Sequence, residues 1–498
     1  MRGTIRSPAG ISGMGVYTPP CRVALQDWCA WTGNDWGKVS NVVGSSFRVP
    51  SCNENAYTMA ATAALRLILN YNVDPARVGF LALGTESASD NSAGAVIVRG
   101  MLDKALKELG MPTISRNCEV PEFKHACLGG VYALKSALRY AEVDGEDRVA
   151  IVVASDIAEY VLGSTGEQTQ GAGSVAMLVE KSPRLAELNT KFSGSGSNYR
   201  GSDFRKPHRR HFMKEYQNYM VSGRITDFPV FSGPYSTLVY LDEVAVAVED
   251  MVSKLRCNAV EHYDSLGALF FHRPYHMMPI QAMSFLYARG LARAESEQHK
   301  KLFAEICTKS KVEPGDVQAE LTKAQNYYEE IEAGTEPTDA FPSTSKVAKA
   351  LRSEAVFKEF LSAKMSLGSS TMANFGNLYT ASLPCWVAAG FEDACMKKLD
   401  ISGQPMVMVG YGSGDASEAI PMTPVKGWEE AAAKINLTEA LGNAVNLTEG
   451  QYKRLHNGTM KEDLAADNRR NEFVVDRIGT RNEVAFQDIG IEYYRFLK

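Results

Sequence analysis

Residues 148–154, RVAIVVA, form an apolar run without polar alternation, which is typical of a strand buried on both faces of a sheet. Similar runs occur at 78–84 (VGFLALG), which ends on a glycine, and at 173–179. Between these runs, the apolar spacing at 57–69 and 95–109 predicts helices. Strands of this kind that alternate with helices predict an α/β fold whose sheet is covered on both faces.

The same order of elements resumes in the second part of the chain. The expected segments there are helices at 241–255, 277–287 and 380–389 and strands at 267–271 and 405–410. Two α/β halves, an N-terminal half at 1–185 and a C-terminal half at 186–424, are therefore the simplest architecture. Their sequences show no repeat, so a duplication rests on the order of elements alone.

Three segments lie outside this pattern. Residues 190–235 are rich in glycine, serine, aromatic and basic residues, which is typical of a long functional loop. Residues 290–345 form a polar insertion, with a helix expected at 319–331. Residues 425–498 form a charged extension that is expected to begin with a short helix.

The composition excludes several classes of protein. Of 498 residues, 45% are hydrophobic and 22% are charged, which is ordinary for a globular protein and unlike a disordered chain or a coiled-coil rod. The 53 basic and 58 acidic residues nearly balance, which argues against a dedicated nucleic-acid binder. No apolar run approaches the roughly 20 residues of a membrane span, and no secretory signal is evident. Nine cysteines without paired Cys-x-x-Cys spacing favour reduced thiols and a cytoplasmic protein.

The strongest local chemical signal surrounds Cys127. It lies in the segment FKHACLGG (123–130), which runs directly into an amphipathic helix at 131–143. A thiol at the N-terminus of a helix meets the positive end of the macrodipole, which lowers the thiol pKa and favours the thiolate. Cys127 is therefore either a nucleophile or, like most of the other eight cysteines, a buried inert thiol.

Three polar residues are candidate partners for such a nucleophile. His272 follows the strand expected at 267–271, and Glu86 follows the strand expected at 78–84, so both lie where α/β sheets open onto clefts. A carboxylate beside apolar walls can serve as a base. The alternatives are a core histidine, a solvated or capping acid and, for Asn377, a turn or cap. No metal-ligand cluster is evident, because the His272 to His276 spacing contains a proline.

Eight short motifs occur in one order along the chain. They are GVYTP (15–19), GTES (84–87), HACLG (125–129), ASDIA (154–158), QTQGAG (168–173), FHRPY (271–275), GNLYT (376–380) and GYGSG (410–414). Together they resemble the 3-hydroxy-3-methylglutaryl-CoA synthase family, a branch of the thiolase-like condensing enzymes. The resemblance covers about residues 10 to 290 and 365 to 420. It implies a duplicated αβαβα layered fold, here with a helical insertion and a C-terminal extension, and a homodimer.

The resemblance also implies roles for individual residues. Cys127 is similar to the acylated nucleophile, Glu86 to the general acid/base, His272 to the acceptor-binding histidine and Asn377 to the amide beside it. The residues expected to contact substrate are Gly171, Arg209, Tyr235, Ser236, Tyr379, Ser413 and Gly414. The implied reaction condenses acetyl-CoA with acetoacetyl-CoA through an acetyl-cysteine and then hydrolyses the thioester, as in the mevalonate pathway. CoA thioesters are the substrates and no cofactor or metal is expected.

Several positions depart from the family pattern. His125, Leu128 and Gln168 replace residues that are common there, and Met277 stands where a lysine is thought to meet the CoA phosphates. A basic cluster at 206–211 is an alternative source of phosphate attraction, or a solvated loop, and the basic rim at 205–210 would also suit an acidic carrier protein. These departures leave a second reading open, an enzyme that adds acetyl to a 3-ketoacyl chain on an acyl carrier protein in polyketide β-branching. A catalytically silent scaffold and a cysteine hydrolase are more remote alternatives.

Overall fold

The computed structural model describes residues 8–88, 90–201, 203–206, 220–221, 224–225, 228–230, 232–325, 327–442 and 444–498. Its main element is a sheet of ten strands in the order β12-β13-β14-β8-β1-β7-β6-β4-β5, with β9 paired to β14. The strands are β1 (Ala9–Tyr17), β4 (Val78–Gly84), β5 (Glu122–Phe123), β6 (Val149–Ala158), β7 (Gly171–Lys181), β8 (Ala186–Leu188), β9 (Gly194–Ser197), β12 (Ala268–Phe271), β13 (Met406–Gly412) and β14 (Ala416–Pro424).

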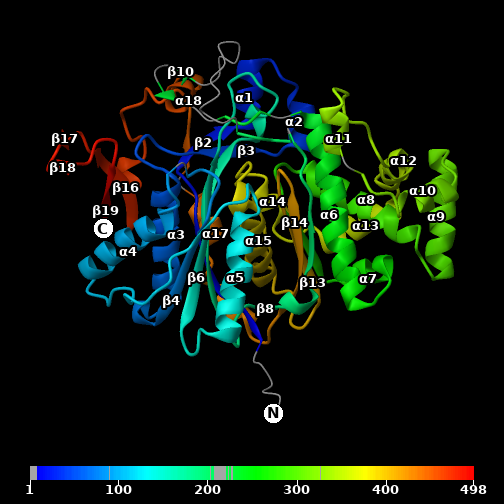
Figure 1. Ribbon diagram of the computed structural model, residues 1–498, viewed down its shortest axis with the longest axis horizontal. Helices are drawn as coiled ribbons and strands as arrows, with labels where there is room; N and C mark the ends of the chain where they lie inside the picture. Colours follow the sequence, from blue (N-terminus) through cyan, green and yellow to red (C-terminus); the bar gives the residue numbers. More distant parts are fainter. Residues whose placement is uncertain are drawn as a thin grey trace.

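Helices cover this sheet in layers (Figure 1). On one outer side, α3 (Ala56–Asn70) packs against β1, β6 and β7. On the other, α6 (Gly233–Leu255) packs against β9, β13 and β14. Between them lie α5 (Gly129–Val143) on β4, β6 and β7, and α15 (Ser382–Met396) on β12 and β13. This is the layered αβαβα arrangement of the thiolase-like fold, as the resemblance implies.

The predicted apolar strands are confirmed, because β4, β6, β7, β12 and β13 occupy the expected positions and are almost wholly buried. The helices predicted at 57–69, 95–109, 277–287 and 380–389 are confirmed as well. They correspond to α3, α4 (Gly94–Glu108), α8 (Met277–Leu291) and α15. Burial on both faces is why these strands show no polar alternation. The division into halves at residue 185 stays a prediction.

Four segments differ from the prediction. The strands β1 and β14 were not expected, and α6 begins at Gly233 rather than at residue 241. In β1, glycines replace larger apolar residues because a Cβ at Gly13 would come within 3 Å of the Tyr71 ring. The helix expected at 319–331 is wrong, because α10 (Pro314–Glu320) and α11 (Tyr327–Glu332) are separate.

In Figure 1 the helices of the insertion lie at one end of the molecule and the last strands of the extension, β16 to β19, lie at the other. The insertion carries α9 (Glu297–Ser310) and α12 (Pro342–Leu351), which pack on α8. The extension carries α16 (Trp428–Ala432), α17 (Leu437–Leu441), β15 (Val445–Asn446), α18 (Glu449–His456), β16 (Glu472–Ile478), β17 (Asn482–Glu483), β18 (Phe486–Gln487) and β19 (Glu492–Leu497). The remaining elements are β2 (Cys21–Ala24), α1 (Leu25–Thr32), α2 (Trp36–Val42), β3 (Ser46–Val49), β10 (Met220–Val221), β11 (Arg224–Ile225), α7 (Ala259–Ser265), α13 (Ala355–Lys364) and α14 (Ser369–Met372). Among the described helices, none is long and apolar enough to cross a membrane.

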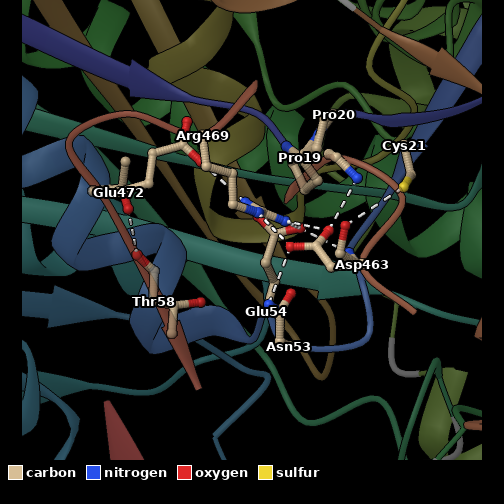
Figure 2. A network of polar contacts seen from close by, with 12 residues as sticks. Pro19, Pro20, Cys21, Asn53, Glu54, Thr58, Asp463, Arg469 and Glu472 are labelled. Atoms are coloured by element: carbon tan, nitrogen blue, oxygen red, sulfur yellow. Dashed lines mark hydrogen bonds and ion pairs between the residues drawn. The ribbon is translucent and has the colours of Figure 1, made fainter. Parts of the chain in front are cut away.

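A buried charge cluster fastens the extension to the N-terminal part of the chain (Figure 2). The Arg469 side chain, 1% exposed, pairs with Glu54 at 3.1 Å, Asp463 at 2.8 Å and Glu472 at 3.0 Å. Tyr17 of β1 donates a short hydrogen bond to Glu54. The neighbouring carboxylates raise the pKa of Arg469, so its charge is retained in the cluster.

We expect Arg469→Met to lower the free energy of unfolding by about 3–5 kcal/mol, because it leaves buried carboxylates without their cation. Denaturant-induced unfolding followed by circular dichroism measures this loss. Arg495→Met is the matched control, since Arg495 is an arginine of the same extension whose side chain is 59% exposed and whose ion pair is solvated. Equal stability of the two variants would contradict a fastening role for Arg469.

Candidate active site

Cys127 lies between β5 and α5, two residues before the first residue of that helix. It is 6% exposed. The N-terminus of α5 packs directly on the strands, since a Cβ at Gly130 would approach Ala154 of β6 to 2.8 Å. The preceding residue, Ala126, has φ +39°, a conformation that residues with a Cβ rarely adopt. Such strain is typical of positions where the backbone presents a functional side chain.

The Cys127 thiol faces a carboxylate. Its Sγ donates a hydrogen bond to Oε2 of Glu86 at 3.5 Å. Burial, followed by the charges of Glu86 and Asp156, raises the pKa of Cys127 well above its usual range. The lowered pKa predicted from the helix dipole is therefore wrong, because burial and two nearby carboxylates outweigh the dipole. The resting thiol is protonated and needs a base, and Glu86 is the group placed to accept its proton.

Asp156, in β6, positions Glu86. Its Oδ1 accepts hydrogen bonds from the backbone N–H groups of Glu86 at 2.8 Å and Ser87 at 3.0 Å, and its Oδ2 accepts one from the Thr380 N–H at 3.0 Å. Asp156 is completely buried. It thus ties the turn after β4 to the segment before α15. No role for Asp156 was predicted from the sequence, although an acid among the small and apolar residues of 154–158 is a signal for one.

His272 directly follows β12. Its N–H donates to the Val409 carbonyl at 2.7 Å, and its own carbonyl accepts from the Tyr240 hydroxyl at 2.7 Å. The imidazole stacks beside Tyr411 with ring centroids 6.3 Å apart. Burial lowers the pKa of His272 to about 3, so the ring is neutral at physiological pH. A neutral imidazole donates one hydrogen bond, as a group that holds a carbonyl oxygen must.

Asn377 is fixed from both sides. Its backbone N–H donates to the Thr169 carbonyl at 3.0 Å, and its Oδ1 accepts from the Tyr379 N–H at 2.9 Å. A Cβ at Gly171 would overlap the Asn377 carbonyl, at 2.4 Å. Gly171 therefore allows the close approach that seats Asn377.

One cavity of about 360 Å³ brings these side chains together. Three of the four expected catalytic residues line it, namely Cys127, His272 and Asn377, while Glu86 is reached through its bond to Cys127. The other lining residues include the aromatic side chains of Tyr160, Phe204, Tyr240, Tyr275 and Tyr411 and the hydroxyls of Thr169, Ser236, Thr237 and Ser413. The volume and the mainly apolar wall with a few convergent polar groups are typical of a small-molecule site.

The other expected substrate residues are placed differently. Ser236 and Ser413 line the cavity, and buried Tyr379 packs in a small cluster with Cys127. Gly171, Tyr235 and Gly414 are not among the lining residues, and the Tyr235 hydroxyl instead donates to the Arg200 carbonyl at 2.6 Å. Arg209 lies outside the described residues. The substrate contacts of all seven stay predictions.

The aromatic wall was missed in the sequence because its members come from separate segments. The nearest signal was the motif at 410–414, which contains Tyr411. Among the described residues, no group of three histidine, cysteine or acidic side chains is arranged to hold a metal ion.

The extension supports the wall of this cavity from behind. The Tyr452 hydroxyl donates to Glu167 at 2.8 Å and accepts from Gln170 at 2.7 Å. Gln170 in turn accepts from the Tyr160 N–H at 2.9 Å, and a ring nitrogen of His456 lies 2.7 Å from the Tyr160 carbonyl. The position of Tyr160 in the cavity wall therefore depends on α18.

The raised pKa of Cys127 predicts an unusual pH profile. In the wild type, alkylation of Cys127 by iodoacetamide should still rise with pH beyond about 8.5, the ordinary cysteine pKa, because the protonated thiol persists. In Glu86→Gln the uncharged amide no longer opposes the thiolate, so the midpoint should move to lower pH. Mass spectrometry of the Cys127 peptide measures the rate, with exposed Cys52 as internal control. An unchanged midpoint in Glu86→Gln would contradict the electrostatic role of Glu86.

Residues 6–183 match the family model described as hydroxymethylglutaryl-coenzyme A synthase N terminal. The hydroxymethylglutaryl-CoA synthase of Haloferax volcanii is 26% identical over 454 residues, which cover 90% of this chain and 91% of that protein. A solved structure of MvaS in complex with 3-hydroxy-3-methylglutaryl coenzyme A has a TM-score of 0.75 at 24% identity and covers 99% of this chain and 100% of its own. The HMG synthase of the curacin biosynthetic pathway, solved in complex with holo donor-ACP, has a TM-score of 0.69 at 18% identity, covering 98% of this chain and all of its own.

Proposed function

We propose that this chain, as a member of the hydroxymethylglutaryl-CoA synthase family, condenses an acetyl group carried on Cys127 with a 3-ketoacyl thioester. The observation that carries the proposal is the Glu86 carboxylate on the Cys127 thiol, beside a cavity that also holds neutral His272 and Asn377. A nucleophile, a base and neutral hydrogen-bond donors are the groups that carbon–carbon bond formation between two thioesters requires.

The first half-reaction loads the enzyme. Glu86 takes the Sγ proton of Cys127, the thiolate attacks the carbonyl carbon of acetyl-CoA, and CoA leaves as the thiol after receiving a proton. This step gives acetyl-Cys127 and regenerates a carboxylate at Glu86. The raised pKa of Cys127 makes the thiolate a strong nucleophile once it forms.

The second half-reaction forms the new bond. Glu86 removes a proton from the acetyl methyl group, and the resulting enolate carbon attacks the 3-keto carbon of the acceptor. The neutral imidazole of His272 donates a hydrogen bond to the acceptor oxygen as it becomes an alkoxide, and Glu86 returns its proton to that oxygen. Water then cleaves the Cys127 thioester and frees the product. A hydrogen bond of this kind to developing negative charge is worth about 3–4 kcal/mol in the barrier.

The first candidate acceptor is acetoacetyl-CoA, which would make the product 3-hydroxy-3-methylglutaryl-CoA and place the reaction in the mevalonate pathway. This is supported by the Haloferax volcanii relative and by the complex of MvaS with that product. We include in the proposal the homodimer and the cytoplasmic location that the family implies.

A 3-ketoacyl chain on an acyl carrier protein is the second candidate. Lys206 donates to the Glu86 carbonyl at 3.3 Å, and Arg205 beside it in the chain is exposed. Both follow Phe204, which lines the cavity. Two cations this close to the cavity wall in sequence suit an acidic carrier protein. The curacin pathway neighbour, solved with donor-ACP, supports this reading.

Product mass spectrometry tests the proposal. Wild type incubated with acetyl-CoA and acetoacetyl-CoA should form 3-hydroxy-3-methylglutaryl-CoA, whereas Cys127→Ala should not. Acetyl-Cys127 without that product would identify the carrier-bound acceptor as the next substrate to assay. Failure to form either species would overturn the proposal and favour a scaffold, and thioester cleavage without a new carbon–carbon bond would favour a hydrolase.

A further inference from the structure

A second cavity, of about 480 Å³, lies beside the first. The two cavities share no lining residue among the described ones, but their walls are formed by consecutive residues: His272 and Val43 line the first, and Arg273 and Gly44 line the second. The second cavity is lined by six serines, Ser40, Ser45, Ser362, Ser366, Ser369 and Ser370. Among the described residues that line it, Arg273 and His276 alone are charged or titratable, and none is acidic.

Arg273 is a buried cation without a counter-charge. The residue is 4% exposed, and its guanidinium donates to the Ser369 hydroxyl at 2.9 Å and contacts His276 Nδ1 at 3.0 Å. The guanidinium also lies over the Trp386 ring, 5.2 Å from its centroid. Within the described ranges, no carboxylate oxygen comes within 4.0 Å of it. All of its partners are therefore neutral.

Other buried arginines of the chain show two ways in which such a charge is accommodated. Arg200 and Arg469, each 1% exposed at the side chain, pair with two or more carboxylates. Arg48 instead donates to the backbone carbonyls of Pro19, Pro20 and Leu441. Burial lowers the pKa of both Arg48 and Arg273 to about 10, but Arg273 differs because it lines a cavity. Burial, together with the charge of Arg273, lowers the pKa of His276 to about 4, so this ring is neutral and accepts a hydrogen bond from Arg273. A buried charge of this kind is costly unless an anion compensates it.

The surroundings of Arg273 suit an oxyanion. A guanidinium offers a planar fork of donors that matches phosphate oxygens, and serine hydroxyls add further donors around it. Ser45, Ser362, Ser366 and Ser370 are exposed at the cavity, so their hydroxyls are accessible to a ligand. We propose that this cavity is a phosphate-binding site, in which Arg273 and the surrounding serine hydroxyls hold the phosphate group of a small molecule.

Two sources share this chemistry. One is a free phosphorylated metabolite, which would bind independently of the reaction. The other is a phosphate of the CoA substrate, and only this source rests on the proposed function. It would supply the phosphate contact that Met277, four residues after Arg273, cannot make.

Isothermal titration calorimetry with inorganic phosphate and with adenosine 3′,5′-bisphosphate, at constant ionic strength, tests the site without requiring activity. We expect saturable binding by the wild type and at least a tenfold loss in Arg273→Met. Arg352→Met is the matched control, because Arg352 also donates to a serine hydroxyl, Ser284 at 2.9 Å, outside this cavity. If Arg273→Met does not fold, Ser370→Glu places a negative charge at the exposed rim of the cavity and should weaken binding in the same way.

The sources are separated by adding CoA. If CoA displaces phosphate from the site, and Arg273→Met raises the KM for acetyl-CoA but not for acetyl-pantetheine, the ligand is a phosphate of the CoA substrate. Phosphate binding that persists at saturating CoA identifies a separate ligand. Absence of saturable phosphate binding in the wild type, or equal binding in the Arg273→Met and Arg352→Met variants, would overturn the site even if the enzyme condenses its substrates as proposed.

Discussion

Cys127→Ala is expected to reduce product formation by on the order of 10⁴-fold or more, because the methyl group cannot hold the acetyl intermediate. The cavity should survive the change. Cys127 is buried but contributes only a small part of a wall to which many aromatic, aliphatic and hydroxyl side chains also contribute. The loss should therefore be one of chemistry rather than of folding. The measurement is the rate of product formation together with the mass of the protein after incubation with acetyl-CoA.

Cys52→Ala is the control for this experiment. Cys52 is exposed and lies outside the cavity, so its removal should leave both the rate and the acetylated mass unchanged. Digestion of the wild type should place the acetyl group on the Cys127 peptide alone. Acetylation that persists in Cys127→Ala would assign the nucleophile to another residue.

Glu86→Gln is expected to separate the two half-reactions. The amide keeps the size of the carboxyl group but cannot remove a methyl proton, so condensation should fall by about 10²- to 10⁴-fold. Acetyl-CoA should still load Cys127, although more slowly than in the wild type. Glu86→Gln removes the base that takes the thiol proton, but it also removes a charge that opposes the thiolate, so water can accept the proton at higher pH. Acetyl-enzyme should therefore accumulate, and quenched-flow mass spectrometry would follow it.

Solvent deuterium gives a second readout for Glu86. In the wild type, reversible removal of the methyl proton should wash deuterium into the acetyl group of acetyl-Cys127, whereas Glu86→Gln should show almost none. Glu122→Gln is the matched control, because Glu122 is another half-buried carboxyl whose pKa burial raises, and it accepts a hydrogen bond from the Gly94 N–H. Condensation by Glu86→Gln at nearly the wild-type rate would make the assignment of the base wrong.

Much of the framework could be predicted from the sequence, because the strands that decide it are buried on both faces. A run such as 148–154 needs no knowledge of its neighbours to be identified as a central strand. Likewise, His272 could be singled out because a strand end followed by Pro274 opens onto a cleft. Both features could be identified because a short stretch of neighbouring residues is enough to determine them.

The features that were missed depend on contacts between distant segments. The pKa of Cys127 is raised by burial and by the charges of Glu86 and Asp156, all of which arise only in the folded chain. The strand β1 is glycine-rich because α3 lies against it, a constraint that its own nine residues do not reveal. The aromatic wall combines Tyr160, Tyr240 and Tyr411, which share a cavity but no pattern. The secondary-structure propensities of a short segment do not predict which distant segments it will contact.

The cluster around Arg469 also constrains the order of events during synthesis on the ribosome. Tyr17 and Glu54 emerge from the ribosome early. Arg469, the cation that lies between them and Glu472, is translated only after more than 400 further residues. The contact between Tyr17 and Glu472 spans 455 positions of the chain. Until then the Glu54 carboxylate must stay hydrated, since it has no cation to accompany it into the core. The region around β1 and α3 therefore reaches its final packing only when the extension has left the ribosome. A nascent chain of this protein exposes unfinished apolar surface for most of its translation, which is the condition under which chaperones bind.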